Sequence, residues 1–488
     1  MPSSLSPNGR CMMPPCWQAL LVLALVLQSG CAPLAPHYVP PALPVAAQYG
    51  LEDAPPSQTP AATLDWRSYF TDPLLQSWIN QALEHNRDLR SAALRVQEAR
   101  AAYGIQHAEL SPSIGAQVGL DRSRTPADLN MSRQPQLGSQ YQVGLGMATW
   151  EIDFWGRLRY LSDAALETYL ASDAARQAVA LGLITQVAQG YLALRELDEH
   201  LTLARQARDN RTQSLRLFTR RVDAGAASRL QLTSYQTLLT QAEAQIAQWE
   251  LARARQVHAL TLLLGQPITL PANTAHWGEA PLAPLQAGLP SDLLVHRPDI
   301  VAAEHQLRAA HAQIGAARAA FFPRIALTGL AGSASAELGG LFDNGSAKWA
   351  FSPSITLPLF TSGRLRDNLQ LQEVRRDMAV AQYEKAVQMA FREVVDALAA
   401  RQGLTTQLHM AQQALSVQGS RTRLMQQRHA QGASTLLELL DAQRDLLQAQ
   451  QQVLQLRYAL LTTQTGLYAA LGGGTLTEQQ PAAPPSAP

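Results

Sequence analysis

The chain has 488 residues, 47% of them hydrophobic and 16% charged, which is enough for two or three ordinary domains or for one large elongated one. Its 39 Lys and Arg residues nearly balance its 38 Asp and Glu residues. This balance gives neither the basic surface of a nucleic-acid-binding protein nor the acidic excess of a solvating tail, so nucleic acid is excluded as a partner.

The first 30 residues have the layout of a bacterial export signal. Arg10 precedes an apolar run over residues 17–27, which is followed by small residues and Cys31. The run has only 11 residues, too few to cross about 30 Å of hydrocarbon as a helix. All three cysteines lie within the first 31 residues, so the rest of the chain has no disulfide and no cysteine metal site. Residues 1–30 are predicted to be removed as a signal peptide.

The residues Gln28-Ser29-Gly30-Cys31 resemble the lipobox of bacterial lipoproteins. The resemblance implies a covalent lipid on Cys31, diacylglycerol plus an acyl chain such as palmitate, and Ala32 is compatible with sorting to an outer membrane. Gln28 departs from the pattern, because an aliphatic residue is usual there, and a plain secretory signal with a chance cysteine is the alternative. Residues 31–62 are rich in Pro and Ala and predict an extended, lipidated tether.

The rest of the chain is predicted to be a tandem duplication of roughly 200 residues. Segment 149–159 aligns with segment 356–366 at an offset of 207, and Gly225-Ala226 aligns with Gly432-Ala433 at the same offset. Upstream the offset is 211, and it pairs His85 with His296, Asp88 with Asp299, and Gly104 with Gly315. The predicted parts are a first repeat at 63–265, an equatorial connection at 266–289, a second repeat at 290–471 and a disordered tail at 472–488.

Each repeat is predicted to end in a long helical hairpin. No proline interrupts the 66 residues from 157 to 222, which correspond to a helix on the order of 100 Å long. Gly225 is suited to a C-cap and Ser228 to an N-cap, so residues 223–228 form the turn, as residues 430–435 do in the second repeat. Shorter helices are expected at 73–110 and 228–265.

The second helix of each hairpin carries an apolar seam with a period of seven residues. In the first repeat the seam consists of Leu232, Leu239, Ile246, Arg253 and Leu260, and the second repeat has Leu or Val 207 residues after each of them. Sevenfold spacing sustained over four heptads predicts coiled-coil packing of antiparallel helices.

Four short segments between the helices alternate between apolar and small or polar side chains. They lie at about 113–122 and 141–152 in the first repeat and at about 324–333 and 348–360 in the second. In the first segment Ile114, Val118 and Leu120 share one face. Each segment has about the length of a tilted membrane strand, and polar loops at 121–140 and 334–347 join each pair.

Four strands cannot close a barrel, and an open sheet edge in lipid would leave backbone groups without hydrogen bonds. Closure therefore has to come from other copies of the chain: a dimer would supply 8 strands, a trimer 12 and a tetramer 16. A small soluble sheet that caps a helical bundle is the alternative.

Several segments resemble the outer membrane factors of bacterial tripartite efflux systems, most of all the OprM-like, NodT-type lipoprotein branch, with TolC a more distant relative. The segments are LLVHRPDI at 293–300, ARAAFFP at 317–323, LPLFTSGR at 357–364, YEKA at 383–386, FREV at 391–394 and WEIDFWGR at 150–157. The resemblance implies an α+β membrane protein: a homotrimer whose 12-stranded β-barrel, four strands per chain, crosses the outer membrane and continues into a periplasmic α-helical coiled-coil barrel. The implied partners are a periplasmic adaptor and an inner-membrane pump of the resistance-nodulation-division (RND) type.

The hairpin tips are the candidate gate of such a duct. Leu437, Glu438 and Asp441 follow the second tip, whereas Leu230, Gln231 and Ser234 stand at the equivalent places in the first repeat. The acids are alternatively solvated residues favoured by the helix dipole. The resemblance implies that they form an aliphatic ring and an acidic ring at a periplasmic constriction, and that the tips, at Gly225, Ala226, Gly432 and Ala433, contact the adaptor.

The sequence shows no catalytic constellation. The 11 histidines have no metal-ligand spacing, and there is no phosphate-binding glycine loop, so neither an enzyme activity nor a cofactor or metal is expected. The predicted function is a passive outer-membrane exit duct for drugs or other small toxic compounds. The alternatives are a lipid-anchored periplasmic coiled-coil adaptor or scaffold, and the same duct serving metal-ion efflux or type I secretion.

Overall fold

The computed structural model describes residues 34–42, 44–46, 64–270, 282–285 and 296–474. The predicted signal peptide, Cys31 and residues 475–488 lie outside these ranges. Contacts divide the chain into two compact units, which are described separately. Unit 1 consists of residues 1–40, 103–165 and 308–377, and unit 2 consists of residues 41–102, 166–307 and 378–488.

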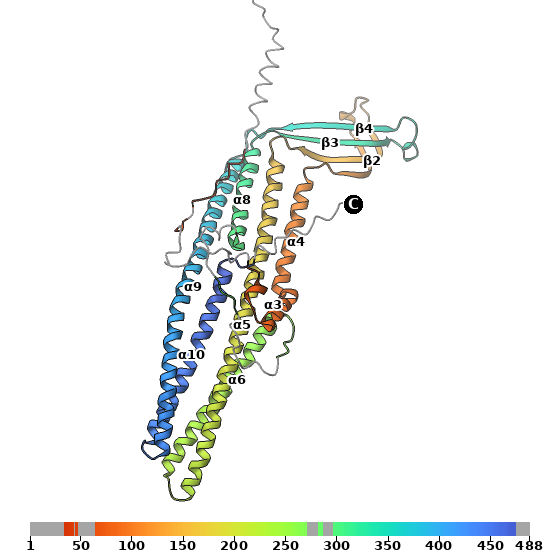
Figure 1. Cartoon of the computed structure of the whole chain (residues 1–488). Helices are drawn as coiled ribbons and strands as arrows, with labels where there is room; N and C mark the ends of the chain where they lie inside the picture. Colours follow the sequence, from red (N-terminus) through yellow and green to blue (C-terminus); the bar gives the residue numbers. More distant parts are fainter. Residues whose placement is uncertain (1–33, 43, 47–63, 271–281, 286–295, 475–488) are drawn as a thin grey trace, which may run out of the picture. The chain divides into compact units, whose positions relative to one another are not determined.

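Unit 1 contains one four-stranded antiparallel sheet, in which each strand pairs with the next one along the chain (Figure 1). The strands are β1 (Ile114–Thr125), β2 (Gln136–Ile152), β3 (Arg324–Ser335) and β4 (Ala347–Thr356). Short 3₁₀ turns, η3 (Ala127–Leu129) and η4 (Leu338–Gly340), lie in the two loops. The ladder between β2 and β3 shifts between Met147 and Trp150, where a bulge interrupts the pairing.

The strand boundaries differ from those expected most of all at the start of β2 and the end of β4. β2 begins at Gln136 rather than near residue 141, because the ladder with β1 continues to the pair Thr125 and Gln136, beyond the apolar alternation. β4 ends at Thr356 rather than near residue 360. Pro358 follows two residues later, and proline has no N–H with which to extend a ladder.

Seven α-helices of ten residues or more are described, and four of them form two long hairpins (Figure 1). The first hairpin joins α5 (Arg157–Asp223) to α6 (Arg229–Leu264), and the second joins α9 (Arg364–Ala430) to α10 (Leu436–Ala470). The other helices are α3 (Pro73–His85), α4 (Arg87–Ala108), α8 (Pro298–Ala319) and the single turn α2 (Trp66–Tyr69). The order helix, strand, strand, long helix, shorter helix therefore occurs twice, and both long helices have 67 residues.

The expected helix over residues 73–110 is two helices, because Asn86 is extended (φ −65°, ψ 132°). Its Nδ2 donates to the carbonyl of Leu263 at 2.9 Å, and its Oδ1 accepts from the N–H of Leu89 at 2.9 Å. The Asn86 side chain thus caps α4 and holds the end of α6 beside it. Gly265 ends α6 with φ 69°, and a Cβ there would collide with the carbonyl of His85, so only glycine fits.

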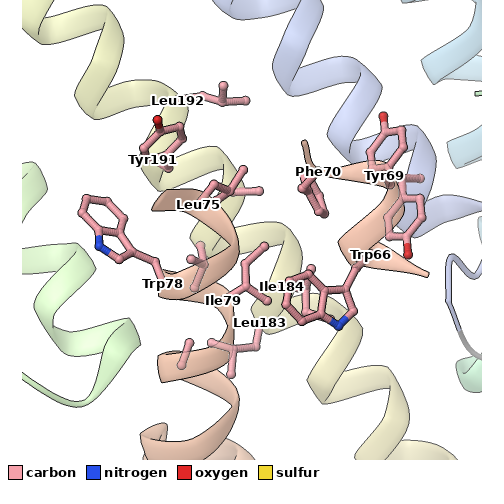
Figure 2. Packing of buried hydrophobic residues seen from close by; sticks show 14 of the residues in the cluster. Trp66, Tyr69, Phe70, Leu75, Trp78, Ile79, Leu183, Ile184, Tyr191 and Leu192 are labelled. Carbon is pink, nitrogen blue, oxygen red and sulfur yellow. The ribbon is translucent and has the colours of Figure 1, made fainter. Parts of the chain in front are cut away.

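The core of unit 2 is a hydrophobic cluster that joins distant parts of the sequence (Figure 2). We call it the aromatic cluster, because leucine, isoleucine, valine and alanine side chains pack in it around six aromatic residues: Trp66, Tyr69, Phe70, Trp78, Tyr191 and Tyr468. Tyr69 stacks on Tyr468 with ring centroids 4.4 Å apart, and the Tyr468 hydroxyl donates to the carbonyl of Leu64 at 2.8 Å. Trp78 meets Tyr191 edge to face. The predicted equatorial connection also packs here, since Phe70 forms an isolated β-bridge with Leu282.

By length and composition, α5 is the one helix among the described residues that could cross a bilayer, and half of its most apolar 18-residue window is buried. The same helix contributes Leu183, Val187 and Leu192 to the aromatic cluster of unit 2. Its apolar stretch is thus used in packing against α3 and its neighbours.

The HRPD part of the segment at 293–300 forms an ion cluster around the buried Arg297, next to the start of α8. The Arg297 guanidinium donates to Asp299 at 2.8 Å, to Glu393 of α9 at 2.5 Å and to the carbonyl of Ala470 in α10 at 3.2 Å. Burial favours the neutral form, but Asp299 and Glu393 outweigh it and raise the pKa of Arg297. This arginine ties three helices of unit 2 together.

Candidate functional site

The two hairpin tips have the same backbone geometry. Gly225 and Gly432 have φ 72° and 73°, in the left-handed region that favours glycine. The N–H of Ala226 donates to the carbonyl of Arg221 at 2.7 Å, and the N–H of Ala433 donates to that of Arg428 at 2.8 Å. Both turns are therefore Schellman C-caps that close the preceding long helix.

Each turn leads into a capping box, and the two boxes differ in charge. In the first hairpin Ser228 caps α6 with Gln231 as its partner. In the second hairpin Thr435 caps α10, and the Glu438 carboxylate accepts from the N–H of Thr435 at 2.8 Å and from its hydroxyl at 3.0 Å. These hydrogen bonds, first of all the one from the backbone, lower the pKa of Glu438. The structure thus places the Glu438 carboxylate at the helix cap.

The start of α10 is expected to loosen in acid. A lowered folded-state pKa means that the ionised Glu438 stabilises the cap above its ordinary pKa of 4.5, and this contribution is lost as the pH falls through the lowered value. Amide hydrogen exchange at residues 438–441 should therefore lose protection below about pH 4.5. The neutral variant Glu438→Gln, which copies the first hairpin, should show no such pH dependence. Equal pH profiles for the two proteins would contradict this assignment.

Asp441 belongs to a chain of ion pairs that the sequence analysis missed. Its carboxylate lies 3.2 Å from Arg444, which also lies 3.2 Å from Asp445. Asp445 in turn lies 2.7 Å from Arg421 of α9, and the hydrogen bonds from Arg421 and Arg444 lower its pKa. The three-residue spacing of Asp441 and Arg444 is a recognisable signal for an ion pair along a helix, but the contact between the adjacent residues Arg444 and Asp445 and the partner Arg421 on α9 required the fold.

A groove of about 580 Å³ lies between the two hairpins in unit 2. Its lining includes Leu437, Asp441 and Arg444 of α10, and from the first hairpin Ser234, the sequence equivalent of Asp441. Of the three predicted gate residues, Leu437 and Asp441 therefore share this groove and Glu438 does not line it. Leu437 is 69% exposed in the single chain.

The first hairpin contributes a cation to the same groove. Arg211 of α5 lines it and donates to the carbonyl of Leu238 in α6 at 2.8 Å. Burial lowers the pKa of Arg211. The groove thus combines two arginines, one aspartate and several amides with leucine side chains, a lining suited to both polar and apolar contacts.

In the part of the chain that the structure describes, no three His, Cys, Asp or Glu side chains come together as metal ligands. A close histidine–carboxylate contact joins His305 of α8 to Glu167 of α5 at 2.6 Å.

The sequence profile of the family described as outer membrane efflux protein matches residues 78–266 and, separately, residues 289–473. The chain is 42% identical over 475 residues to the solvent efflux pump outer membrane protein SrpC of Pseudomonas putida, covering 95% of this chain and 99% of that protein. It is 41% identical over 456 residues to the outer membrane protein OprJ of Pseudomonas aeruginosa, covering 93% and 95%. Its structure resembles the open state of the MtrE outer membrane channel of Neisseria gonorrhoeae, with a TM-score of 0.82, 38% identity and coverage of 91% and 99%.

Proposed function

Because the chain belongs to the outer membrane efflux protein family, whose members are channels and not enzymes, we propose that it works as a passive trimeric exit duct. It is the outer-membrane channel of a tripartite efflux pump. The observation that supports the trimeric duct best is the four-stranded sheet of unit 1, because such a sheet is incomplete by itself.

The edges and the outer face of the sheet support closure by other copies of the chain. Strands β1 and β4 are the two edge strands. Among the described strands β1 pairs only with β2, and β4 pairs only with β3. Large apolar side chains on one face of the sheet are exposed: Val118 is 82% exposed, Trp349 79% and Ile355 71%. An apolar outer face suits lipid, but open edges do not, so three chains would join β1 of one copy to β4 of the next in a 12-stranded barrel.

The repeated order of elements supports an origin by tandem duplication. Besides the two 67-residue helices, α6 has 36 residues and α10 has 35. The family profile also matches the chain twice. In the trimer the two hairpins of each chain would supply four helices, and twelve helices would form the periplasmic tunnel.

A lipid anchor on Cys31 is supported by the docking of the residues that follow it. The Tyr160 hydroxyl accepts from the N–H of Leu34 at 3.0 Å, and Arg318 donates to the carbonyl of Leu34 at 3.1 Å. Tyr38 packs edge to face on His311, with Arg308 over its ring. The start of the predicted tether is therefore clasped to unit 1, which would hold a lipid on Cys31 close to the barrel.

Crowding at Gly315 should release this clasp. A Cβ at Gly315 would lie 2.9 Å from Ala35 and from the Tyr160 ring, so Gly315→Leu should displace the segment. The readout is the rate at which a maleimide labels Ala35→Cys in the purified protein, which we expect to rise several-fold. Gly104→Leu is the matched control, because Gly104 is the equivalent residue of the first repeat and has open space around it. Equal labelling in both variants would refute the clasp.

The gate is proposed at the groove between the hairpins. Three copies of Leu437 and Asp441 would surround the end of the tunnel, with Asp441 held by Arg444. Crowded carboxylates would favour cations and repel one another, so contact with a partner or protonation would shift the open and closed populations. Glu438 is assigned to the helix cap beside this ring.

We assign organic solvents and antibiotics as cargo, because relatives are named as solvent, toluene and antibiotic efflux pump outer membrane proteins. The partners would be a periplasmic adaptor at the tips, around Gly225, Ala226, Gly432 and Ala433, and an inner-membrane RND-type pump. The protein would need no cofactor besides its lipid.

Deletion of the gene tests the function. Cells without the protein should accumulate toluene and antibiotics and become several-fold more sensitive to them, and a plasmid copy should restore resistance. In parallel, the purified protein should insert into planar bilayers and give small or flickering currents. Unchanged sensitivity together with failure to insert would point instead to a periplasmic scaffold.

A further inference from the structure

Two arginines continue the apolar column of β1 toward the strand-to-strand loop. Successive side chains of a strand alternate between faces, so Arg122 and Arg124 share the face of Ile114, Val118 and Leu120. These three apolar residues are 70%, 82% and 58% exposed. In the proposed barrel this face meets lipid, which places both arginines on the lipid side of the wall rather than in the lumen.

The register of the sheet gives their level along the barrel. On β2 the apolar column runs from Ile152 to Tyr141, about 34 Å along the strand and about 26 Å in height at a tilt of about 40°, close to the thickness of an apolar band. Arg122 lies opposite Ser139 and Arg124 opposite Leu137, both beyond Tyr141. A charged side chain is unfavourable at mid-membrane and tolerated at the interface, so the pair belongs at the headgroup level.

The topology identifies the leaflet. The four strand ends that join helices all lie at one end of the strands. Both strand-to-strand loops lie at the opposite end, which is the end nearer to Arg122 and Arg124. The proposed function puts the helical hairpins in the periplasm, so the loops face the outside. The lipid at this level is then the phosphorylated glycolipid, lipid A, of the outer leaflet.

Both guanidinium groups are available to such a lipid. Among the described residues neither Arg122 nor Arg124 makes a side-chain hydrogen bond or an ion pair, and both are exposed. The planar guanidinium donates two parallel hydrogen bonds to a phosphate, which makes arginine the preferred partner for that group. Two arginines two residues apart on one face lie about 7 Å from each other.

We propose that Arg122 and Arg124 form a binding site for the phosphates of one lipid A molecule in the outer leaflet. The proposal rests on the proposed channel function, because that function sets the orientation of the barrel. The bound lipid would cover β1, which is an edge strand of the chain and would lie at a junction between two copies in the trimer.

The test is native mass spectrometry of the full-length, detergent-purified protein titrated with bis-phosphorylated lipid A. The variant is Arg122→Gln with Arg124→Gln. The control, Arg133→Gln with Lys348→Gln, removes the same charge from positions in or next to the strand-to-strand loops but off this column. Arg133 is in the β1–β2 loop, and Lys348, near the start of β4, lines a small hollow with Gln117 and Gln142 on the other face. We expect the variant to bind lipid A about tenfold more weakly and the control to match the wild type.

Lipid A without phosphates should bind the wild-type protein about as weakly as bis-phosphorylated lipid A binds the variant. Inorganic phosphate should not displace lipid A from the wild-type protein. Equal binding by variant and wild type, equal weakening in the control, or displacement by inorganic phosphate would each overturn the proposal. Single-channel currents from the same preparations distinguish a failure of the lipid A site from a failure of the proposed channel function. Inserted, conducting wild-type protein with unchanged variant binding defeats only the arginine site, whereas wild-type protein that never inserts defeats the channel and the site together.

Discussion

Replacing Asp441 by alanine is expected to raise the mean single-channel conductance of the purified channel several-fold and to weaken its preference for cations. Asp441 lines the groove between the hairpins and pairs with Arg444 at 3.2 Å. In the trimer its loss removes a ring of carboxylates and releases Arg444 from one of its two acids, so the tips should separate more often. The measurement is conductance in a planar bilayer, with reversal potentials in a salt gradient.

The chain supplies a matched control for this experiment. Ser234 stands at the equivalent position of the first hairpin and lines the same groove, so Ser234→Ala changes a side chain at the same level without removing a charge. Its conductance should stay at the wild-type value. An Asp441→Ala channel that inserts normally and conducts like the wild type would rule out a gate at this residue.

Replacing Tyr468 by alanine should lower the stability of the protein by about 4 kcal/mol, as truncation of large buried aromatic residues does. Tyr468 is fully buried, stacks on Tyr69 and binds the Leu64 carbonyl. Gly473 also lies directly against its ring, and Gly474 lies against its hydroxyl. The change would thus loosen the attachment of α10 to the segment that precedes α2.

Thermal unfolding of the purified protein, followed by circular dichroism at 222 nm, measures this effect. Tyr468→Ala should lower the Tm by several degrees. Tyr468→Phe is the control, because it keeps the stacked ring and loses only one hydrogen bond, worth about 1 kcal/mol. If both variants melt with the wild type, the aromatic cluster does not hold these segments together.

Local patterns predicted the helical hairpins and the faces of the strands. The glycine at each tip and the Ser228 cap follow from chain chemistry that acts within a few residues, and the structure has them where expected. The face of Val118 follows from strict alternation in the same way. Along the seam of α6, burial increases away from the tip, since Leu232 is half-buried and Leu260 is fully buried.

Features that depend on a distant partner could not be predicted. The break at Asn86 needs the carbonyl of Leu263, and the ion pairs around Asp445 need Arg421 on another helix. Glu438 is the opposite case, because a local pattern was sufficient to predict its role. Its spacing of three residues from Thr435 indicates a capping box, but the sequence analysis interpreted its charge as part of the pore. Trimer formation, the gate and the lipid on Cys31 remain predictions.

The unpaired edges of β1 and β4 carry a genetic consequence. If every barrel needs three chains, a damaged copy made in the same cell enters barrels together with intact copies, and one faulty member leaves two seams unsealed. A variant defective in these edge strands should therefore be dominant-negative: it should reduce resistance even while the intact gene is fully expressed. Variants that never reach the assembly step should instead be recessive, so dominance in co-expression distinguishes faults of the barrel seam from faults of folding.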